Sequence, residues 1–195
     1  MRTKLVLASS SPRRQALLRQ IGARDFEIRV SDADETCDPA LSPGQLVEAL
    51  SRRKAEAVVW NEGEVIIAAD TMVFLDSRRL GKPKDPAEAL RMLQALRGRH
   101  HTVCTGVTVR RGDEYRTEHE ATDVLFRGDI TDEELRAYVD TGEPLDKAGG
   151  YGIQARGVLL VERIDGEYSN VIGLPLPRLA RMLQFFEINL LTELW

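Results

Sequence analysis

The stretch KLVLASSSPRRQALL, residues 4–18, decides the fold class of this chain. It opens on an apolar run, residues 4–8, of the kind that forms a buried strand. Ser11 and Pro12 then suit the N-cap and the first position of a helix, and Leu17 lies on the apolar face of that helix. A strand, a tight loop and a helix therefore follow one another at the start of the chain, which predicts the α/β class.

The same signals predict further strands and helices along the chain. Apolar or alternating runs predict strands, and capping residues predict helix starts; the strands are expected over residues 26–30, 65–69, 102–109, 115–126 and 158–164, and the helices from near Ser42, Asp85, Thr131 and Pro177. Two of these strands flank a short turn, residues 110–113, and are expected to form a hairpin. Because the elements alternate but include a hairpin, we expect a mixed central sheet flanked by helices. No repeat, linker or low-complexity segment divides the chain, so residues 1–195 are expected to form a single domain.

The composition limits the classes of partner. The chain has 195 residues, of which 43% are hydrophobic and 30% charged, as in ordinary globular proteins. Its 27 basic and 31 acidic residues give a net charge of −4, which offers no general attraction to nucleic acid or to an anionic membrane. The apolar run at the N-terminus is too short for a signal peptide, and no apolar stretch is long enough to span a membrane. We therefore expect a cytoplasmic protein without a nucleic-acid or membrane partner.

Two arginines stand at the start of the first predicted helix. Arg13 and Arg14 face the positive end of the helix dipole, which disfavours cations by about 0.3 to 1 kcal/mol each. A phosphate would relieve this cost, because it could accept hydrogen bonds from the backbone, from the hydroxyls of Ser9 and Ser11, and from an arginine fork. A solvated arginine pair, with Ser11 serving only as the helix cap, fits the spacing equally well.

Lys54 lies within an apolar stripe of the second predicted helix. Leu46, Val47, Leu50 and Val58 form this stripe at helical spacing. A lysine in such a stripe commonly extends along the core until its ammonium reaches water. It can instead project into a cleft and bind phosphate oxygens. The residues alone favour the first interpretation.

Asp70 follows the apolar run 65–69 directly, so it is expected at the carboxyl end of an interior strand. Ligands bind at that edge in open α/β sheets. A carboxylate there can bind Mg²⁺ or accept a proton from water, or it can merely cap the next turn. The acidic loop, residues 32–39, contains Glu35 and offers a second metal ligand, although such loops are usually only solvated.

Two further segments carry weaker signals. Gly81-Lys82-Pro83 places a lysine in a turn, and the glycine-rich segment DKAGGYGIQ, residues 146–154, either approaches a ligand closely or forms an ordinary surface loop. The sequence contains no GxxxxGK[ST], GxGxxG, HExxH or GxSxG motif. Phosphate chemistry in this chain would therefore depend on scattered basic residues and carboxylates.

Taken together, these segments resemble the Maf family of nucleotide pyrophosphatases over residues 5–176. The pieces that carry the resemblance keep the family's order and spacing: LVLASSSPRRQALL (5–18), Asp34-Glu35, Lys54, Ala69-Asp70-Thr71, Gly81-Lys82-Pro83, HTVCTG (101–106), Gly142-Glu143-Pro144, DKAGGYGIQ (146–154) and NVIGLP (170–175). The resemblance implies a mixed α/β fold related to the inosine-triphosphate pyrophosphatases (Maf/Ham1-like), with two lobes around a cleft and a homodimeric state.

The resemblance also implies a reaction and a set of roles. The reaction is hydrolysis of a nucleoside triphosphate to the monophosphate and pyrophosphate, with Mg²⁺ or Mn²⁺ as the cofactor. Asp70 is then the catalytic base and a metal ligand, with Glu35 as a second metal ligand. The residues implied to bind the substrate are Ser9, Arg13, Arg14, Lys54, Thr71, Lys82 and Gln154.

Within the family, the segments SPRR, ADT and DKAGxYGIQ resemble the branch that acts on dTTP and UTP. The branch that acts on 7-methyl-GTP differs at all three, and Arg13, Thr71 and Gln154 occupy the positions associated with that choice. Ala155-Arg156 departs from the glycine and apolar residue of many members, which leaves the fine base preference open. The alternatives are the 7-methyl-GTP branch and a non-catalytic nucleotide-binding regulator of cell division. Asp70 argues against the regulator, because a sensor gains little from a carboxylate beside a triphosphate.

Overall fold

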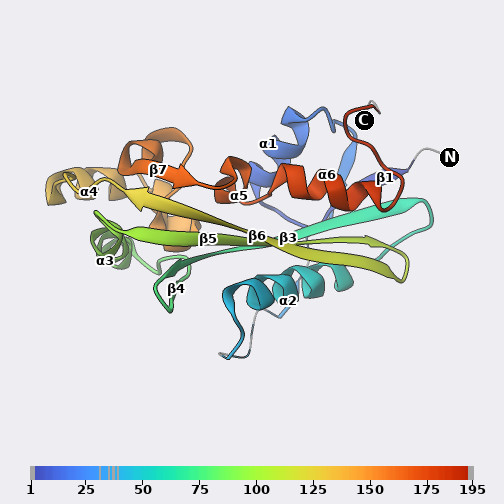
Figure 1. The fold of residues 1–195 in the computed structure, drawn as a ribbon, viewed down its shortest axis with the longest axis horizontal. Coiled ribbons are helices and arrows are strands. Elements are labelled where there is room, and N and C mark those ends of the chain that lie inside the picture. Colours follow the sequence, from blue (N-terminus) through green and yellow to red (C-terminus); the bar gives the residue numbers. More distant parts are fainter. Residues whose placement is uncertain (1–2, 31, 35, 37, 39, 193–195) are drawn as a thin grey trace. The chain divides into compact units, whose positions relative to one another are not determined.

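The computed structural model describes residues 3–30, 32–34, 36, 38 and 40–192 (Figure 1). Its strands are β1 (Lys4–Leu7), β2 (Phe26–Ile28), β3 (Glu64–Leu75), β4 (Arg78–Leu80), β5 (His100–Arg111), β6 (Glu114–Phe126) and β7 (Val161–Asp165). Its α-helices are α1 (Pro12–Gln20), α2 (Pro43–Glu56), α3 (Pro86–Leu96), α4 (Asp132–Val139), α5 (Tyr168–Ile172) and α6 (Leu176–Gln184). Three short 3₁₀ helices, η1 (Glu143–Asp146), η2 (Ala148–Gly150) and η3 (Ala155–Leu160), lie between α4 and β7.

The strands form one sheet in the order β2-β1-β3-β5-β6-β7, and β4 pairs with β3. β1 runs parallel to both β2 and β3, whereas β4 is antiparallel to β3 and β7 is antiparallel to β6. A turn at Gly112 and Asp113 joins β5 to β6, as the predicted hairpin requires. The prediction of a mixed sheet is therefore confirmed. Among the described residues, no helix is both long and apolar enough to cross a membrane.

Two compact units divide the chain. Unit 1 consists of residues 1–70, 105–120 and 173–195, and unit 2 consists of residues 71–104 and 121–172. The two lobes expected from the family resemblance are thus present as compact units. The cleft between them and the single domain over the whole chain stay predictions.

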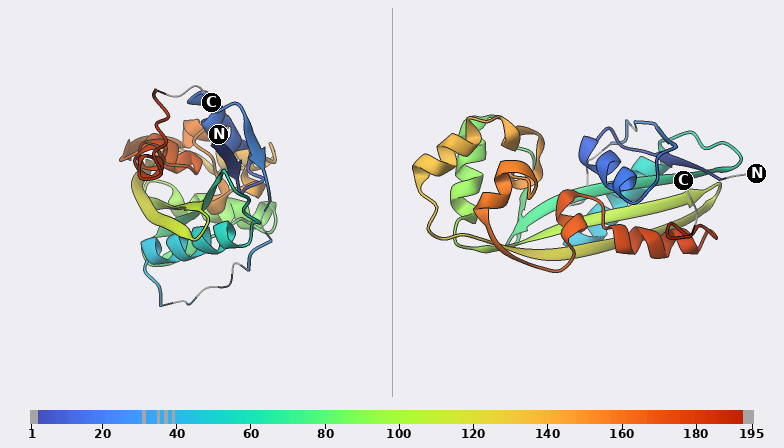
Figure 2. Two further views of the ribbon diagram at one scale, coloured as in Figure 1. Left: turned by 90° about the vertical axis from the view of Figure 1, so that its right-hand side faces the viewer. Right: turned by 90° about the horizontal axis from the view of Figure 1, so that it is seen from above.

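In unit 1, helices cover both faces of the strands (Figures 1 and 2). α2 lies on one face, where Ala55 packs with Ile66 and Ala68 of β3, and α1 and α6 lie on the other face. The backbone of α2 approaches β5 so closely that a Cβ at Gly106 would come within 2.1 Å of the carbonyl oxygen of Val47. Only glycine fits at this position, and this packing fixes the distance between α2 and the sheet.

The helix starts follow the capping signals of the sequence. Ser42 and Gln45 form a reciprocal capping box at α2, and Thr131 and Glu134 form one at α4. The Asp85 carboxylate accepts the hydrogen bond of a first-turn N–H at α3. Each cap is worth about 1 kcal/mol, so these helix starts are determined locally.

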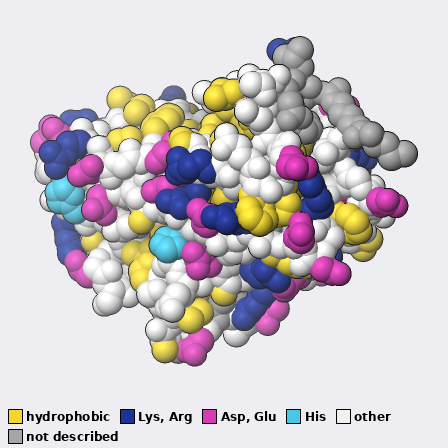
Figure 3. Space-filling model, turned by 45° about the vertical axis from the view of Figure 1, so that its right-hand side comes forward, with side chains coloured by type: hydrophobic (Ala, Val, Ile, Leu, Met, Phe, Trp, Pro, Cys, Tyr) yellow, Lys and Arg dark blue, Asp and Glu magenta, His cyan; other side chains and the backbone are white. Residues whose placement is uncertain are grey.

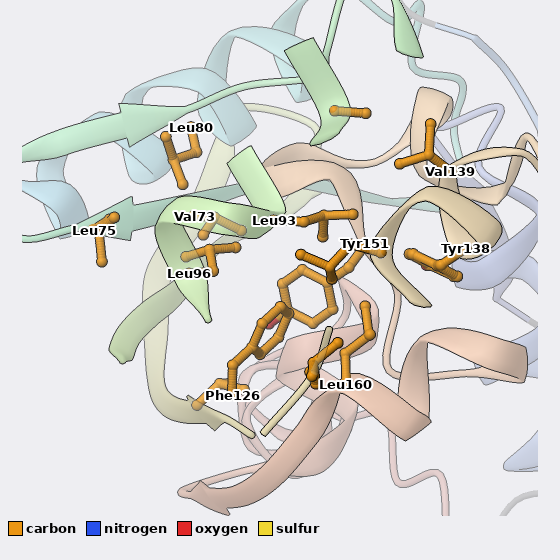
Figure 4. Close-up of a cluster of buried hydrophobic side chains, with 14 of the residues drawn as sticks. Val73, Leu75, Leu80, Leu93, Leu96, Phe126, Tyr138, Val139, Tyr151 and Leu160 are labelled. Atoms are coloured by element: carbon orange, nitrogen blue, oxygen red, sulfur yellow. The ribbon is translucent and has the colours of Figure 1, made fainter. Parts of the chain in front are cut away.

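In unit 2, one apolar cluster joins α3 and α4 to the strands (Figure 4). Leu93 and Leu96 of α3 pack in this cluster with Val73 of β3, Phe126 of β6 and Val139 of α4. All five side chains are nearly inaccessible to solvent. Tyr151 and Leu160 belong to the same cluster, so it anchors the segment that carries η1, η2 and η3 to the core of unit 2.

The expectation that a strand ends at Asp70 is wrong. β3 continues through Leu75, because Val73 and Phe74 are buried and the end of the strand pairs with β4. Asp70 therefore lies inside a strand of 12 residues and does not cap a turn. The sequence rule failed because it treats a charged residue as the boundary of an apolar run, whereas this carboxylate is itself buried.

The strand predicted over residues 158–164 begins too early, because residues 158–160 belong to η3. The N–H of Gly157 donates a hydrogen bond to the Glu143 carboxylate, 3.2 Å away, and is not available to a sheet ladder. Ala155 has a φ of 51°, which lies outside the extended region. The 3₁₀ helix that these residues begin extends through Leu160, so the predicted strand forms only from Val161 onward.

The face drawn in Figure 3 carries basic and acidic side chains in an interspersed pattern. Ion pairs of this kind in unit 1 include Arg178 with Glu118 at 2.7 Å and with Glu120 at 2.9 Å. The pattern agrees with the small net charge of the sequence and offers no continuous basic surface on this face.

His101 is buried in unit 2. Its Nε2 lies 2.6 Å from the hydroxyl oxygen of Tyr151, and the rings of Phe126 and Tyr151 meet it edge-on at centroid distances of 5.0 and 5.3 Å. Burial lowers the pKa of His101 to about 4. The imidazole is therefore neutral at neutral pH, and its role in this unit is packing and hydrogen bonding.

We expect the free energy of unfolding to fall as the pH falls from about 6.5 to about 4 because of His101. The unfolded chain binds a proton near the ordinary pKa of 6.5, while the folded chain does so only near 4, so protonation favours unfolding within this window. The contribution of His101 to the free energy of unfolding is fully present above a pH of about 6.5. Its loss at low pH is at most about 3 kcal/mol. Urea unfolding at a series of pH values measures it. His101→Phe should flatten the curve, whereas His100→Phe at the exposed neighbouring position should not, and equal slopes in all three proteins would contradict the assignment.

Candidate active site

The predicted base and one predicted phosphate ligand form an ion pair in unit 1. Nζ of Lys54, in the last turn of α2, lies 2.5 Å from Oδ1 of Asp70 on β3. Both side chains are largely buried, with 15% of the Lys54 side chain and 10% of the Asp70 side chain exposed. The ammonium is therefore directed at a carboxylate. The first interpretation of the apolar stripe, in which the ammonium extends to bulk water, is wrong.

The packing of α2 on the sheet produces this pair. Ile66 and Ala68 of β3 face α2 and pack with Ala55. Side chains alternate along a strand, so Asp70 points to the same face as these two residues. Lys54 precedes Ala55 in the helix and reaches the strand just beyond the apolar contact.

The second carboxylate oxygen of Asp70, Oδ2, is buried and has no hydrogen-bond partner among the described residues. Leaving a buried acceptor unsatisfied costs about 1 to 3 kcal/mol, and more for a charged group. Such an oxygen is unusual in a structural role. It is the atom that could accept a hydrogen bond from a water molecule or bind a hard cation.

Asp70 therefore fits the expected divalent metal, because Mg²⁺ and Mn²⁺ prefer carboxylate oxygens as ligands and Oδ2 has no other partner among the described residues. Glu35, the second predicted ligand, lies outside the described residues. Within the described part of the chain, no three His, Cys, Asp or Glu side chains gather in a way that could hold a metal ion. Metal binding stays a prediction.

Ser9 and Arg14 make contact at the start of α1. Oγ of Ser9 accepts hydrogen bonds from Nη1 of Arg14 at 3.1 Å and from the backbone N of Ser11 at 3.2 Å. Arg14 also donates from Nε to the carbonyl oxygen of Gly173, 2.8 Å away. Ser11 stands at the N-cap as predicted, but its own hydroxyl makes no capping hydrogen bond. Arg13, the neighbour of Arg14 in the first turn, is half-buried.

Ser9 follows β1, and Asp70 lies within the neighbouring parallel strand β3. Leu7 of β1 pairs with Ile67 of β3. Two residues beyond this pair come Ser9 and Ala69, and Asp70 follows directly. The Ser9–Arg14 contact and the Lys54–Asp70 pair therefore lie in one region of unit 1, at the end of β1.

The other predicted substrate ligands belong to unit 2. Thr71 follows Asp70 on β3 and is half-buried, and Lys82 is exposed in the segment between β4 and α3, where residues 81–83 are not assigned as a turn. The N–H of Gly149 donates to the carbonyl oxygen of Gly81 at 3.0 Å, so the segment with Lys82 is held against the glycine-rich segment. Gln154 is half-buried immediately before η3.

Residues 4–186 match the family model described as Maf-like protein. The chain belongs to the Maf family. Among its relatives, a protein of Symbiobacterium thermophilum is 50% identical over 190 residues, which cover 97% of this chain and 97% of the relative. A protein of Bacillus cytotoxicus is 47% identical over 185 residues, which cover 94% and 96%. Both relatives are named dTTP/UTP pyrophosphatase.

Among solved structures, the Maf-family chain is similar to the Ham1 protein of Staphylococcus aureus. The two share 16% sequence identity with a TM-score of 0.47. The aligned part covers 65% of this chain and 73% of the Ham1 chain.

Two residues with clear contacts had no role in the sequence-based site. Gly173 presents its carbonyl oxygen to Arg14, and the Glu143 carboxylate accepts hydrogen bonds from the backbone N–H groups of Arg156 and Gly157, just after the glycine-rich segment. Both lie in segments that carry the resemblance to the Maf family, Gly142-Glu143-Pro144 and residues 170–175. Their place in these segments was the only signal in the sequence, because a hydrogen bond to a backbone group does not depend on the type of residue that supplies that group.

Proposed function

We propose that this chain hydrolyses a nucleoside triphosphate at the α–β phosphoanhydride, releasing the monophosphate and pyrophosphate, with dTTP and UTP as substrates. The single observation that carries the proposal is the buried Lys54–Asp70 pair with its unsatisfied Oδ2. It supplies a base and a cation in one place, as phosphoryl chemistry requires. The dTTP/UTP pyrophosphatases of Symbiobacterium thermophilum and Bacillus cytotoxicus support the substrate.

Asp70 acts as the base in this proposal. Its free oxygen orients a water molecule and takes one proton from it as the water oxygen attacks a phosphorus of the α–β bridge. When the attacked atom is the α-phosphorus, its bond to the bridging oxygen breaks, and pyrophosphate leaves with the electron pair of that bond. Lys54 stabilises the negative charge that develops during this step. No covalent intermediate with the protein is required.

Asp70, with Glu35 as a second ligand, would hold the divalent ion. A bound Mg²⁺ or Mn²⁺ supplies charge neutralisation at the phosphate oxygens. Ser9, Arg13, Arg14 and Lys82 are the proposed phosphate ligands. Arg14 is already aligned for this role by its bonds to Ser9 and to the Gly173 carbonyl.

Gln154 is proposed to select the base. Its amide offers both a donor and an acceptor, which matches the edge of a uracil or thymine ring. Thr71 and Arg13 are proposed to modulate this choice from the phosphate side. Since Ala155-Arg156 departs from the common family pattern, the preference among dTTP, UTP and CTP is less sharply specified than the rejection of purines.

The alternatives are a 7-methyl-GTP pyrophosphatase and a nucleotide-binding regulator without turnover. The names of the relatives favour the dTTP/UTP branch over the first. The unsatisfied oxygen of Asp70 favours an enzyme over the second, because binding alone does not need it. The cytoplasmic location and the homodimer stay predictions.

We expect the purified protein to convert dTTP and UTP to the monophosphate and pyrophosphate only in the presence of Mg²⁺ or Mn²⁺. Chromatography of the products from a panel with UTP, dTTP, CTP, GTP and 7-methyl-GTP measures this, with a chelator as the control. Release of orthophosphate would contradict cleavage at the α–β phosphoanhydride. Full activity in the presence of the chelator would contradict the dependence on a divalent metal. If 7-methyl-GTP gave the highest rate, the chain would be assigned to the 7-methyl-GTP branch of the family.

A further inference from the structure

Glu143 is a half-buried carboxylate in unit 2 that the proposed chemistry does not use. Its Oε1 accepts hydrogen bonds from the Tyr138 hydroxyl at 3.0 Å and from the backbone N of Gly157 at 3.2 Å. Its Oε2 accepts from the backbone N of Arg156 at 3.3 Å. The two oxygens of this carboxylate thus accept hydrogen bonds from two consecutive backbone N–H groups, those of Arg156 and Gly157.

Tyr138 extends this network to the other side of the glycine-rich segment. Its hydroxyl oxygen accepts from the backbone N of Gly152 at 3.3 Å while its proton is donated to Glu143. Burial raises the pKa of Tyr138, so the hydroxyl keeps the proton that this arrangement needs. Gln154 lies between the two anchored ends, two residues after Gly152 and two before Arg156.

The backbone between these anchors is closed tightly. A Cβ at Gly157 would come within 1.9 Å of the Gly152 carbonyl oxygen and within 2.8 Å of the Tyr138 hydroxyl. Ala155, which follows Gln154, is held at a φ of 51°, a conformation that a residue with a Cβ rarely adopts. Such a conformation persists only where surrounding contacts hold it. The hydrogen bonds from Gly152 to Tyr138 and from Arg156 and Gly157 to Glu143 lie on the two sides of Ala155.

We propose that Glu143, through Tyr138, is a positioning residue that sets the conformation of residues 152–157 and thereby the selection of the pyrimidine base by Gln154. This inference rests on the proposed function, because base selection by Gln154 belongs to it. Rejection of a wrong base depends on polar groups held in fixed positions, and a displacement of about 1 Å costs up to about a hundredfold in rate. Glu143 itself does not contact the substrate in this proposal.

The experiment compares Glu143→Gln with wild type through the ratio of kcat/KM for UTP to that for GTP. The glutamine has nearly the same shape but presents an NH₂ group to one of the donors that the carboxylate accepts. We expect the ratio to fall by about tenfold or more, mainly through a higher KM for UTP. Glu162→Gln, which removes the same charge from an exposed position of β7, should leave the ratio unchanged.

A double-mutant cycle with Gln154→Ala separates positioning from general damage. In the Gln154→Ala background, Glu143→Gln should produce no further change in the ratio, because the group that it positions is gone. An equal change in both backgrounds, or an equal loss of activity with every nucleotide, would overturn the inference. If Glu143→Gln does not fold, Tyr138→Phe tests the same relay with its ring intact and should lower the ratio in the same direction.

The outcomes also separate this inference from the proposed function. A wild-type enzyme without preference for UTP over GTP overturns the base assignment and this inference with it. A selective wild-type enzyme whose ratio is unchanged in both Glu143→Gln and Tyr138→Phe overturns this inference alone.

Discussion

Replacing Asp70 by asparagine should abolish turnover while nucleotide binding persists. The amide has nearly the shape of the carboxylate but cannot take the proton from the attacking water. A positioned general base contributes about 10²- to 10⁴-fold to the rate, so kcat should fall by a factor in this range. Pyrophosphate release measures turnover, and titration with UTP measures binding.

The ion pair makes a stability control necessary for this variant. Asp70→Asn leaves the ammonium of Lys54 buried without its countercharge, and the loss of one partner from a buried pair costs about 3 to 5 kcal/mol. Adding Lys54→Met should recover much of that stability and none of the activity. Wild-type rates in a folded Asp70→Asn protein would disprove the catalytic assignment.

Lys54→Ala should give the second largest loss. Truncating one partner of a desolvated charge pair typically costs about 2 to 5 kcal/mol, which corresponds to a fall in kcat/KM of about 30-fold to several thousandfold. The loss should appear largely in kcat if the ammonium stabilises the leaving pyrophosphate, because that charge develops only in the transition state.

Lys84→Ala is the matched control for this prediction. Lys84 is exposed in unit 2 and has no role in the proposed site. It should keep wild-type kinetics with UTP. Equal kcat/KM in Lys54→Ala and Lys84→Ala would show that the Lys54–Asp70 pair is a structural contact only.

Local signals predicted most of the secondary structure correctly. The capping boxes at Ser42 and Thr131 fix the starts of α2 and α4, since their hydrogen bonds form within one turn of chain. The failures are at places where distant contacts prevail over local preference. β3 runs past Asp70 because β4 pairs with its end, and β7 begins only at Val161 because η3, whose Gly157 N–H binds Glu143, extends through Leu160.

The sequence by itself determined which residues are present, where the helices begin, and the order of segments that marks the Maf family. These follow from side-chain chemistry and spacing within a few residues of chain. Helical spacing left two fates open for Lys54, since a stripe shows which face a residue occupies and not what lies opposite. The tertiary structure decided that its partner is Asp70, by packing α2 over the alternating face of β3. It also decided the contacts of Glu143, because hydrogen bonds to backbone groups depend on how the chain is folded and not on which residues supply them.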